Sequence, residues 1–309
     1  MSTLKIRQKI KQLNNIDLDK NDYKFLVSQL RAASDGINMP IQFRSLEIYF
    51  RARVCNSMKI QKVTELGAPP ATLITGYQRC NPPGVSMFYA ASKRMTALLE
   101  CDSKEGDTVY LGQWINNTYV PINRIFAQLN DELVEFSESD MHFHTYLETL
   151  FTRQIHKTFN IEYKLTAAAA ELLTTRYFHK HTFQTHNGET ETIDTDGTGG
   201  LSYPSVTNKS NSYNTVFHAN FANKNLKLIH VTQLRITKKT DREYSVKIID
   251  TANETLDGNI LWLNSQHSIP KQDISSRTGI ELISNGRDYI VPVYDTPLTD
   301  DNINRFLNE

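Results

Sequence analysis

Two arginines lie two positions apart in a segment that alternates apolar and polar residues. Within Leu46–Val54 the apolar residues fall on one side, and because successive side chains of a strand point to opposite faces, Arg51 and Arg53 share the polar face. A guanidinium binds two oxygens of a phosphate at once, so such a pair could hold a phosphorylated ligand. The ordinary alternative is a solvent-exposed strand face whose arginines pair with glutamate.

Further residues that could take part in chemistry are spread along the chain. A carboxylate stabilises developing positive charge, a tyrosine stacks or hydrogen-bonds, and a serine hydroxyl both donates and accepts. Taken singly, each also fits a structural role, such as a core tyrosine, a solvated carboxylate or a turn serine. The residues are Arg79 in the loop GYQRCNPPG, Tyr89 in a short apolar segment, Glu100 at the end of a predicted helix and Ser205 after a Gly-rich stretch.

Generic catalytic motifs are absent from the sequence. It contains no GxSxG, HExxH or GxxxxGK[ST] pattern. The GTGG at Gly197–Gly200 lies among polar turn-forming residues and lacks the strand-to-helix setting of a dinucleotide-binding loop. Its composition predicts a loop.

Histidines are the remaining candidates for a metal centre. His142 with His144, and His179 with His181, form HxH pairs, and His186 lies nearby. Two such histidines share a face only on a strand, whereas the surroundings read as helix or loop. Since no cysteine or carboxylate completes a defined ligand spacing, we predict no metal centre.

A mixture of helices and strands must position these residues. Strands and helices follow one another without a regular βαβ order, which predicts an α+β fold. Asp19, Asn21 and Asp22 are the candidate N-caps of the second helix. The expected elements are two helices within 4–35, strands at 46–54 and 85–92, a helix with Ser92 as N-cap, a strand at 107–114, mostly helix over 123–175, a polar loop over 186–200 and a short strand at 201–206. A β-rich tail is expected to follow, with a strand at 226–231, a hairpin at 234–250, and strands at 259–263 and 288–294.

The composition restricts the class of protein. The chain has 309 residues, with 34 basic and 34 acidic side chains. Because a nucleic-acid-binding protein needs a surplus of Lys and Arg, this balance argues against direct binding to nucleic acid. Three cysteines without a CxxC pair indicate a reducing compartment. No signal-peptide pattern and no apolar run of about 18 residues is present, so we expect a cytoplasmic protein that does not enter a membrane.

Three strings, taken together and in order, resemble the RES domain, a family named for its Arg, Glu and Ser. They are YFRARV at 49–54, QRCNPPGVSMFYAASKRMTALLE at 78–100, and DGTGGLSYPSV at 196–206, followed by Asn214. The likeness spans about 46–250, and the middle string is its most specific part. The chain departs from the family pattern at Gln78, where Gly is usual, at Cys80, where an aromatic residue is usual, and at Phe88, where Leu is frequent.

The resemblance implies an α+β fold similar to that of ADP-ribosyltransferases, with a mixed or antiparallel sheet, flanking helices and a cleft that binds NAD+ as substrate without a metal. We expect an N-terminal helical segment at 1–43, a catalytic domain at 44–252, and a β-rich C-terminal extension at 253–309 packed on the core. Many RES proteins are toxins restrained by an antitoxin, so an inhibitor protein is an expected partner. A homodimer is a further expectation.

Site residues carry over by position. Cleavage of the nicotinamide–ribose bond passes through an oxocarbenium-like state, so a carboxylate beside the ribose is required, and Glu100 matches the family glutamate. Arginines suit the pyrophosphate, a tyrosine can stack on nicotinamide, and Ser205 matches the family serine. The resemblance implies catalytic roles for Arg51, Glu100 and Ser205. The residues expected to bind NAD+ are Arg51, Arg53, Arg79, Tyr89, Glu100 and Ser205.

Three functions stay open at this point. The first is an enzyme that consumes NAD+ by phosphorolysis or hydrolysis, in a toxin–antitoxin or defence system. The second is an ADP-ribosyltransferase that modifies a protein target. The third is a nucleotide-binding or interaction module that has lost catalysis, although the presence of the Arg, Glu and Ser weighs against it.

Overall fold

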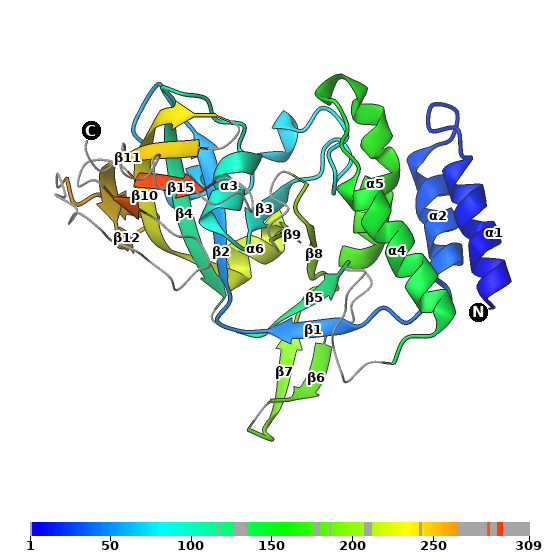
Figure 1. Cartoon of the computed structure of the whole chain (residues 1–309). Coiled ribbons are helices and arrows are strands. Elements are labelled where there is room, and N and C mark those ends of the chain that lie inside the picture. The colour runs from blue at the N-terminus through cyan, green and yellow to red at the C-terminus, as the bar shows by residue number, and fades with distance from the viewer. Residues whose placement is uncertain are drawn as a thin grey trace.

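The chain folds into a mixed sheet flanked by helices (Figure 1). The structure is a computed structural model, and it describes residues 2–116, 118–125, 135–175, 180–185, 187–206, 212–240, 243–264, 283–284 and 289–292. Within these ranges there are six α-helices and a large sheet of eleven strands. The fold class is therefore α+β, as the sequence predicts.

Pairing in the large sheet is antiparallel except between β5 and β8, which are parallel. Two short hairpins stand apart from it, β6 (Lys180–Gln184) with β7 (Thr190–Asp194), and β12 (Glu254–Leu256) with β13 (Asn259–Leu261). The strand order in the large sheet is β1 (Ile41–Arg44), β5 (Val120–Arg124), β8 (Gly200–Pro204), β9 (Tyr213–His218), β3 (Met87–Ala91), β2 (Ile48–Val54), β4 (Thr108–Asn116), β10 (Leu226–Lys239), β11 (Glu243–Ala252), β15 (Tyr289–Pro292) and β14 (Ile283–Ser284).

The sheet is weakly joined between β2 and β3. These strands share a single registered pair, Phe50 with Ala91, whereas β2 and β4 pair over seven residues from Ile48 to Val54. The short helix α3 (Arg94–Glu100) packs against β2, β3 and β4 beside this opening. Because two parted strands leave room between them, side chains from both can line a cavity here.

Four helices gather at the opposite end from β10 and β11 (Figure 1). They are α1 (Thr3–Asn14), α2 (Tyr23–Ser34), α4 (Glu138–Thr152) and α5 (Lys164–Thr174). The predicted pair of N-terminal helices is confirmed, and of the three candidate caps Asp22 is the one that accepts a hydrogen bond, from Phe25 N at 2.6 Å. No helix in the described part of the chain has the length and apolarity that crossing a membrane requires.

Helix α5 is buried between the N-terminal helices and the sheet. Its four alanines, residues 167–170, are at most 1% exposed, and their small side chains let α2 and β8 approach closely. Ile6, Leu26 and Leu30 are fully buried in the same hydrophobic cluster as α5 and Leu201 of β8. The N-terminal helices therefore share the core of the rest of the molecule.

The remaining helical segments are short. The helix α6 (Ala219–Asn225) follows β9, and the described residues also form three 3-10 helices. They are η1 (Val63–Glu65), η2 (Ala71–Leu73) and η3 (Lys157–Tyr163).

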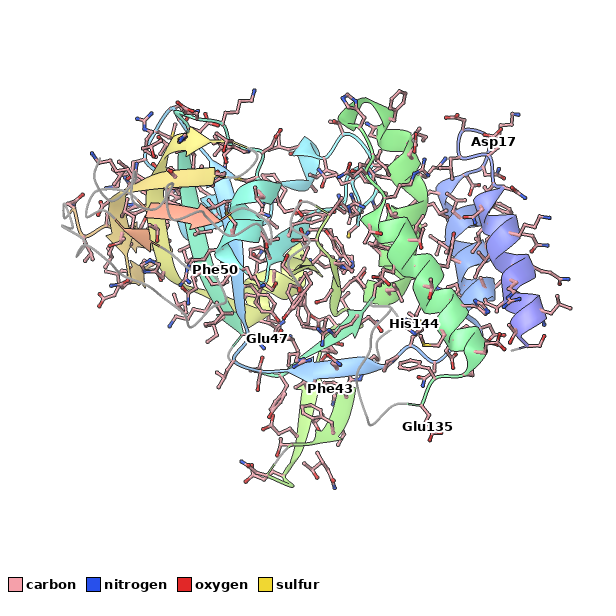
Figure 2. All side chains as sticks on the ribbon, in the orientation of Figure 1. Asp17, Phe43, Glu47, Phe50, Glu135 and His144 are labelled. Atoms are coloured by element: carbon pink, nitrogen blue, oxygen red, sulfur yellow. The ribbon has the colours of Figure 1, made fainter. Side chains whose placement is uncertain are left out.

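Three expectations about elements are wrong. The 186–200 segment is not all loop, because 190–194 forms β7 against β6, a hairpin anchored by a stack of Phe183 on Phe43 of β1 with ring centroids 4.3 Å apart (Figure 2). Residues 123 and 124, expected at the start of a mostly helical region, are instead the end of β5. Ser92 does not cap α3, since its backbone N–H and its hydroxyl pair with Tyr213 and extend the sheet; the N-cap is Lys93.

Candidate functional site

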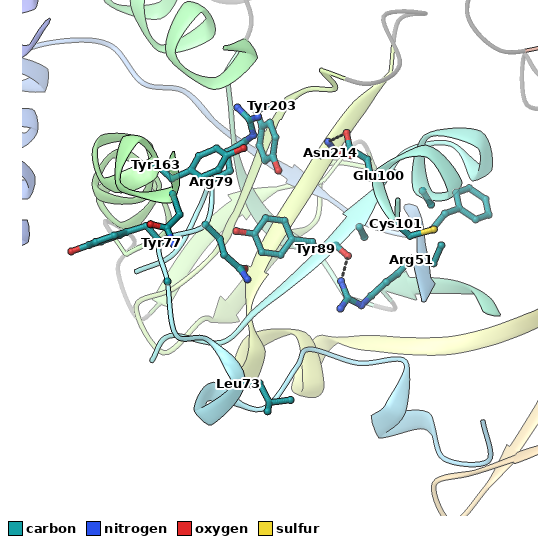
Figure 3. A pocket seen from close by; sticks show the side chains of 18 of the residues that line it. Arg51, Leu73, Tyr77, Arg79, Tyr89, Glu100, Cys101, Tyr163, Tyr203 and Asn214 are labelled. Atoms are coloured by element: carbon teal, nitrogen blue, oxygen red, sulfur yellow. Dashed lines mark hydrogen bonds between the residues drawn. The ribbon is translucent and has the colours of Figure 1, made fainter. Parts of the chain in front are cut away.

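A cavity of about 590 Å³ lies at the opening between β2 and β3 (Figure 3). This volume is within the range of small-molecule sites. Its charged lining residues are Arg51, Arg79 and Glu100, in the part of the chain that the structure describes. The other walls come from β3, the loop before Cys80, η3, and the strands β8 and β9; the lining includes Phe50, Ala52, Leu73, Thr75, Gly76, Tyr77, Gln78, Tyr89, Ala90, Ala91, Ala97, Cys101, Asn160, Tyr163, Tyr203 and Asn214.

Glu100, the last residue of α3, is fixed by two hydrogen bonds on one carboxylate oxygen. Ser205 Oγ donates to Glu100 Oε1 at 2.9 Å, and Asn214 Nδ2 donates to the same atom at 2.8 Å. Ser205 follows β8, and its own N–H is held by Ser212 O. The structure thus brings the predicted Glu100 and Ser205 together, with Asn214 of β9 as the third member.

Arg51 of β2 also lines the cavity, and Figure 3 shows it on the same side of Tyr89 as Glu100. Its Nε donates to the carbonyls of Leu66 and Gly67, both at 3.2 Å, and its Nη1 donates to Tyr89 O at 2.7 Å. Burial, and then the nearby charge of Arg53, lower the pKa of Arg51 to about 10, so the guanidinium stays charged at neutral pH. Nη2 has no hydrogen-bond partner among the described residues, which leaves that edge available to a ligand.

Arg53 does not reach the cavity. It lies on the same strand face as Arg51, but its Nη1 donates to Glu65 O of η1 and its side chain is exposed. The cavity wall next to Arg51 is instead built from β3 and α3. The prediction that Arg53 binds NAD+ therefore gains no support from its position.

Arg79 lines the cavity and also holds the end of α4. Its guanidinium donates to the carbonyls of Phe151 and Arg153, and it lies over the ring of Tyr163 with 5.2 Å between Cζ and the ring centroid. Cations favour the C-terminal end of a helix, where carbonyls lack partners. Arg79 is therefore less available to a phosphate than Arg51 is.

Tyr89 contributes its ring to the cavity, whereas its hydroxyl is committed elsewhere. The hydroxyl donates to Asn81 Oδ1 at 2.6 Å and accepts from Cys80 N at 3.0 Å. Burial raises the pKa of Tyr89 well above 10, so the hydroxyl keeps its proton. Cys80 is buried beneath it, and burial raises the pKa of its thiol to about 12. Stacking by the Tyr89 ring is consistent with this geometry.

The predicted histidines occupy separate places. His142 contacts Arg7 and Glu138 on the surface, and His144 contacts Asn38 O from the other side of α4. His181 is in β6, while His179 and His186 lie outside the described residues. Across the ranges given above, no group of three or more His, Cys, Asp or Glu side chains is gathered.

One wall of the cavity consists of residues that the sequence does not mark as candidates for the site. Tyr77, Gln78, Asn160 and Tyr163 line it, and two of them come from η3, more than 70 positions after the loop they face. No local pattern marks Asn160 or Tyr163, because only the packing of α4 and α5 brings η3 to the opening. Gln78 could have been found as a departure from the family pattern.

Comparisons with known proteins add no assignment. No protein-family model matches the chain, and no curated protein has a significant match to it. The resemblance to the RES domain therefore stays a hypothesis that rests on the quoted strings.

Proposed function

We propose that the chain is an NAD+-consuming enzyme of the RES type, which cleaves the bond between nicotinamide and ribose. The observation that carries the proposal is the Glu100 carboxylate, oriented by Ser205 and Asn214 on the wall of a cavity that Arg51 and Tyr89 also line. An open sheet beside a short helix is consistent with an ADP-ribosyltransferase-like core, and we include that fold in the proposal.

The chemistry needs an oriented anion and no strong general acid. When the C1′–N bond breaks, its electron pair goes to the pyridinium nitrogen, and nicotinamide leaves as a neutral molecule. The ribose then carries positive charge shared between C1′ and O4′, which the Glu100 carboxylate stabilises. Water or phosphate forms the new bond to C1′ through an oxygen and gives up a proton to solvent where it carries one.

Binding of the dinucleotide is assigned to Arg51 and Tyr89, which line the same cavity as Glu100. The free Nη2 edge of Arg51 can take a pyrophosphate oxygen, while Nε and Nη1 keep the guanidinium in place through three backbone carbonyls. The ring of Tyr89 offers a flat surface to nicotinamide or ribose. In a cell such an enzyme drains NAD+, so we propose a toxin role with an inhibitor protein as partner.

Replacement of Glu100 tests the proposal. In Glu100→Gln the amide oxygen still accepts from Ser205 and Asn214, but the negative charge is lost. We expect nicotinamide release from NAD+ to fall by about 100-fold or more, since removal of one electrostatic group from an active site has effects of that size. Release is measured by chromatography with and without phosphate, and thermal unfolding checks the fold. Glu105→Gln, an exposed change outside the cavity, is the matched control.

Products separate the proposal from its alternatives. Free ADP-ribose or its phosphate identifies hydrolysis or phosphorolysis. Transfer of labelled ADP-ribose to a cellular protein would identify a protein-modifying enzyme instead. Binding of NAD+ by calorimetry with no product from the wild-type protein would indicate a module without catalysis, and undiminished turnover in Glu100→Gln would remove Glu100 from the mechanism.

A further inference from the structure

The cavity has a second wall that the catalytic residues do not use. Figure 3 shows Tyr77, Arg79 and Tyr163 on one side of Tyr89, and Glu100 with Asn214 on the other. This second wall is formed by the loop at 76–79 and by η3.

Asn160 places a free side-chain amide on this wall. Its Nδ2 lies only 2.6 Å from the position that a Cβ on Gly76 would take, so the amide packs on the bare backbone of that glycine. The side chain is exposed in the cavity and makes no hydrogen bond to any described residue. Both its carbonyl oxygen and its NH2 group are therefore available to a ligand.

Gln78 places a second amide on the same wall. Its backbone is fixed by reciprocal hydrogen bonds with Asn81, at 2.9 and 3.4 Å. Its side chain is exposed, and within the described ranges it too has no hydrogen-bond partner.

Two half-buried aromatic rings flank the amides. The Tyr163 ring is held against the Arg79 guanidinium, and the Tyr77 ring against that of Tyr23 with centroids 5.8 Å apart. Rings fixed in this way lose little entropy when a flat base packs on them.

We infer that this wall is the binding site for the adenine base of the dinucleotide. Side-chain amides match adenine because their oxygen accepts from its N6 amine and their NH2 donates to a ring nitrogen, while tyrosine rings contact its face. The inference rests on the proposed function: with the nicotinamide riboside at Glu100 and the pyrophosphate at Arg51, the adenosine half extends to the wall beyond Tyr89.

Substrate analogues test the inference without any mutation. Nicotinamide hypoxanthine dinucleotide differs from NAD+ in carrying oxygen in place of the N6 amine. We expect kcat/KM for NAD+ to exceed that for the analogue by about 10-fold or more, the size of one lost pair of base hydrogen bonds. A ratio near one in the wild-type enzyme would overturn the inference and leave the proposed function standing.

Variants test whether the two amides cause the preference for NAD+ over the hypoxanthine analogue. Asn160→Ala and Gln78→Ala should each lower the ratio several-fold, with thermal unfolding unchanged because both side chains are exposed. Gly76→Ala should act like Asn160→Ala, since its new Cβ displaces the amide. Asn220→Ala, an exposed amide on α6 that is not among the lining residues, is the control and should leave the ratio unchanged. If all three cavity variants keep the wild-type ratio of kcat/KM values, the wall does not bind the adenine base.

Binding separates a failure of this inference from a failure of the proposed function. ADP-ribose is titrated by calorimetry against its hypoxanthine counterpart. Tighter binding of ADP-ribose, weakened in Asn160→Ala, would support the adenine site even if NAD+ is not cleaved, and the proposed function alone would then fail. If neither ligand binds and NAD+ is not cleaved, both proposals are overturned.

Discussion

Asn214 offers a direct test of the electrostatic surroundings of Glu100, because one substitution replaces its neutral amide by a carboxylate. Its amide is buried, at 7% exposure, and donates to Glu100 Oε1 at 2.8 Å. An aspartate of the same shape would bring a second carboxylate within hydrogen-bond distance. Two carboxylates this close share a proton, so one of their pKa values is raised.

We therefore expect Asn214→Asp to lower nicotinamide release at neutral pH by about 10- to 100-fold, and to shift the acidic limb of the pH–rate profile upward. The profile of kcat from pH 5 to 9 measures this. Asn220→Asp adds the same charge on exposed α6 and should leave the profile in place. An unshifted acidic limb in Asn214→Asp would show that the Glu100 carboxylate does not control the rate.

At the scale of single residues, one part of the site could be predicted from the sequence. Glu100, Ser205 and Asn214 converge as the order of the quoted strings implies: Glu100 ends α3, Ser205 directly follows the end of β8, and Asn214 is the second residue of β9. Arg53 and Arg79 differ from expectation for long-range reasons. Strand alternation places Arg53 beside Arg51 but cannot show that η1 lies over it, and the carbonyls that Arg79 binds belong to a helix about 70 positions away.

Helix α4 contains a buried histidine that cannot take up a second proton easily (Figure 2). His144 Nε2 lies 2.9 Å from Asn38 O, and since a carbonyl only accepts, Nε2 carries the hydrogen. Nδ1 is buried with no partner among the described residues. Burial lowers the pKa of His144 below its usual 6.5, although the Asn38 hydrogen bond and the Asp140 charge oppose the shift.

A lowered histidine pKa makes stability depend on pH in a fixed direction. Below about pH 6.5 the unfolded chain binds a proton that the folded chain does not, so the free energy of unfolding falls as pH falls, by at most about 1.4 kcal/mol per pH unit for one group. We expect His144→Gln, whose amide can still donate to Asn38, to show a shallower loss between pH 7 and 5 in urea unfolding. His142→Gln, on the exposed side of the same helix, should follow the wild-type slope. Equal slopes in all three proteins would contradict the assignment.

Elements with a strong apolar pattern can be predicted from the sequence, whereas elements that depend on contacts with distant segments cannot. The N-terminal helices agree with their patterns because one face of each is buried, and β4 is apolar over a run of residues that is buried on both faces. The β6–β7 hairpin has mostly polar, exposed residues, and Phe183 packs on Phe43 of β1 and on Tyr119. A polar ribbon of this kind has no alternation that distinguishes it from a loop.

At the scale of the whole molecule, the predicted border at residue 43 does not coincide with a break in the core. Lys164, at the start of α5, is 7% exposed, and its Nζ donates to Leu18 O at 2.8 Å and to Asn21 O at 2.6 Å. These two carbonyls belong to the turn between α1 and α2. A buried ammonium thus ties the N-terminal helices to α5 and, through η3, to the cavity wall that contains Tyr163.

Loss of the two Lys164 hydrogen bonds should lower the stability of the whole fold. Lys164→Met keeps the length of the side chain but leaves two carbonyls without their charged donor, and we expect the free energy of unfolding to fall by about 2–4 kcal/mol. Urea unfolding measures the change, and Lys24→Met, at an exposed position of α2, should stay within about 0.5 kcal/mol of the wild type. A single cooperative transition that moves as a whole is expected, because Ile6, Leu26 and Leu201 belong to one core. A separate early transition in Lys164→Met would instead show that the N-terminal helices unfold independently.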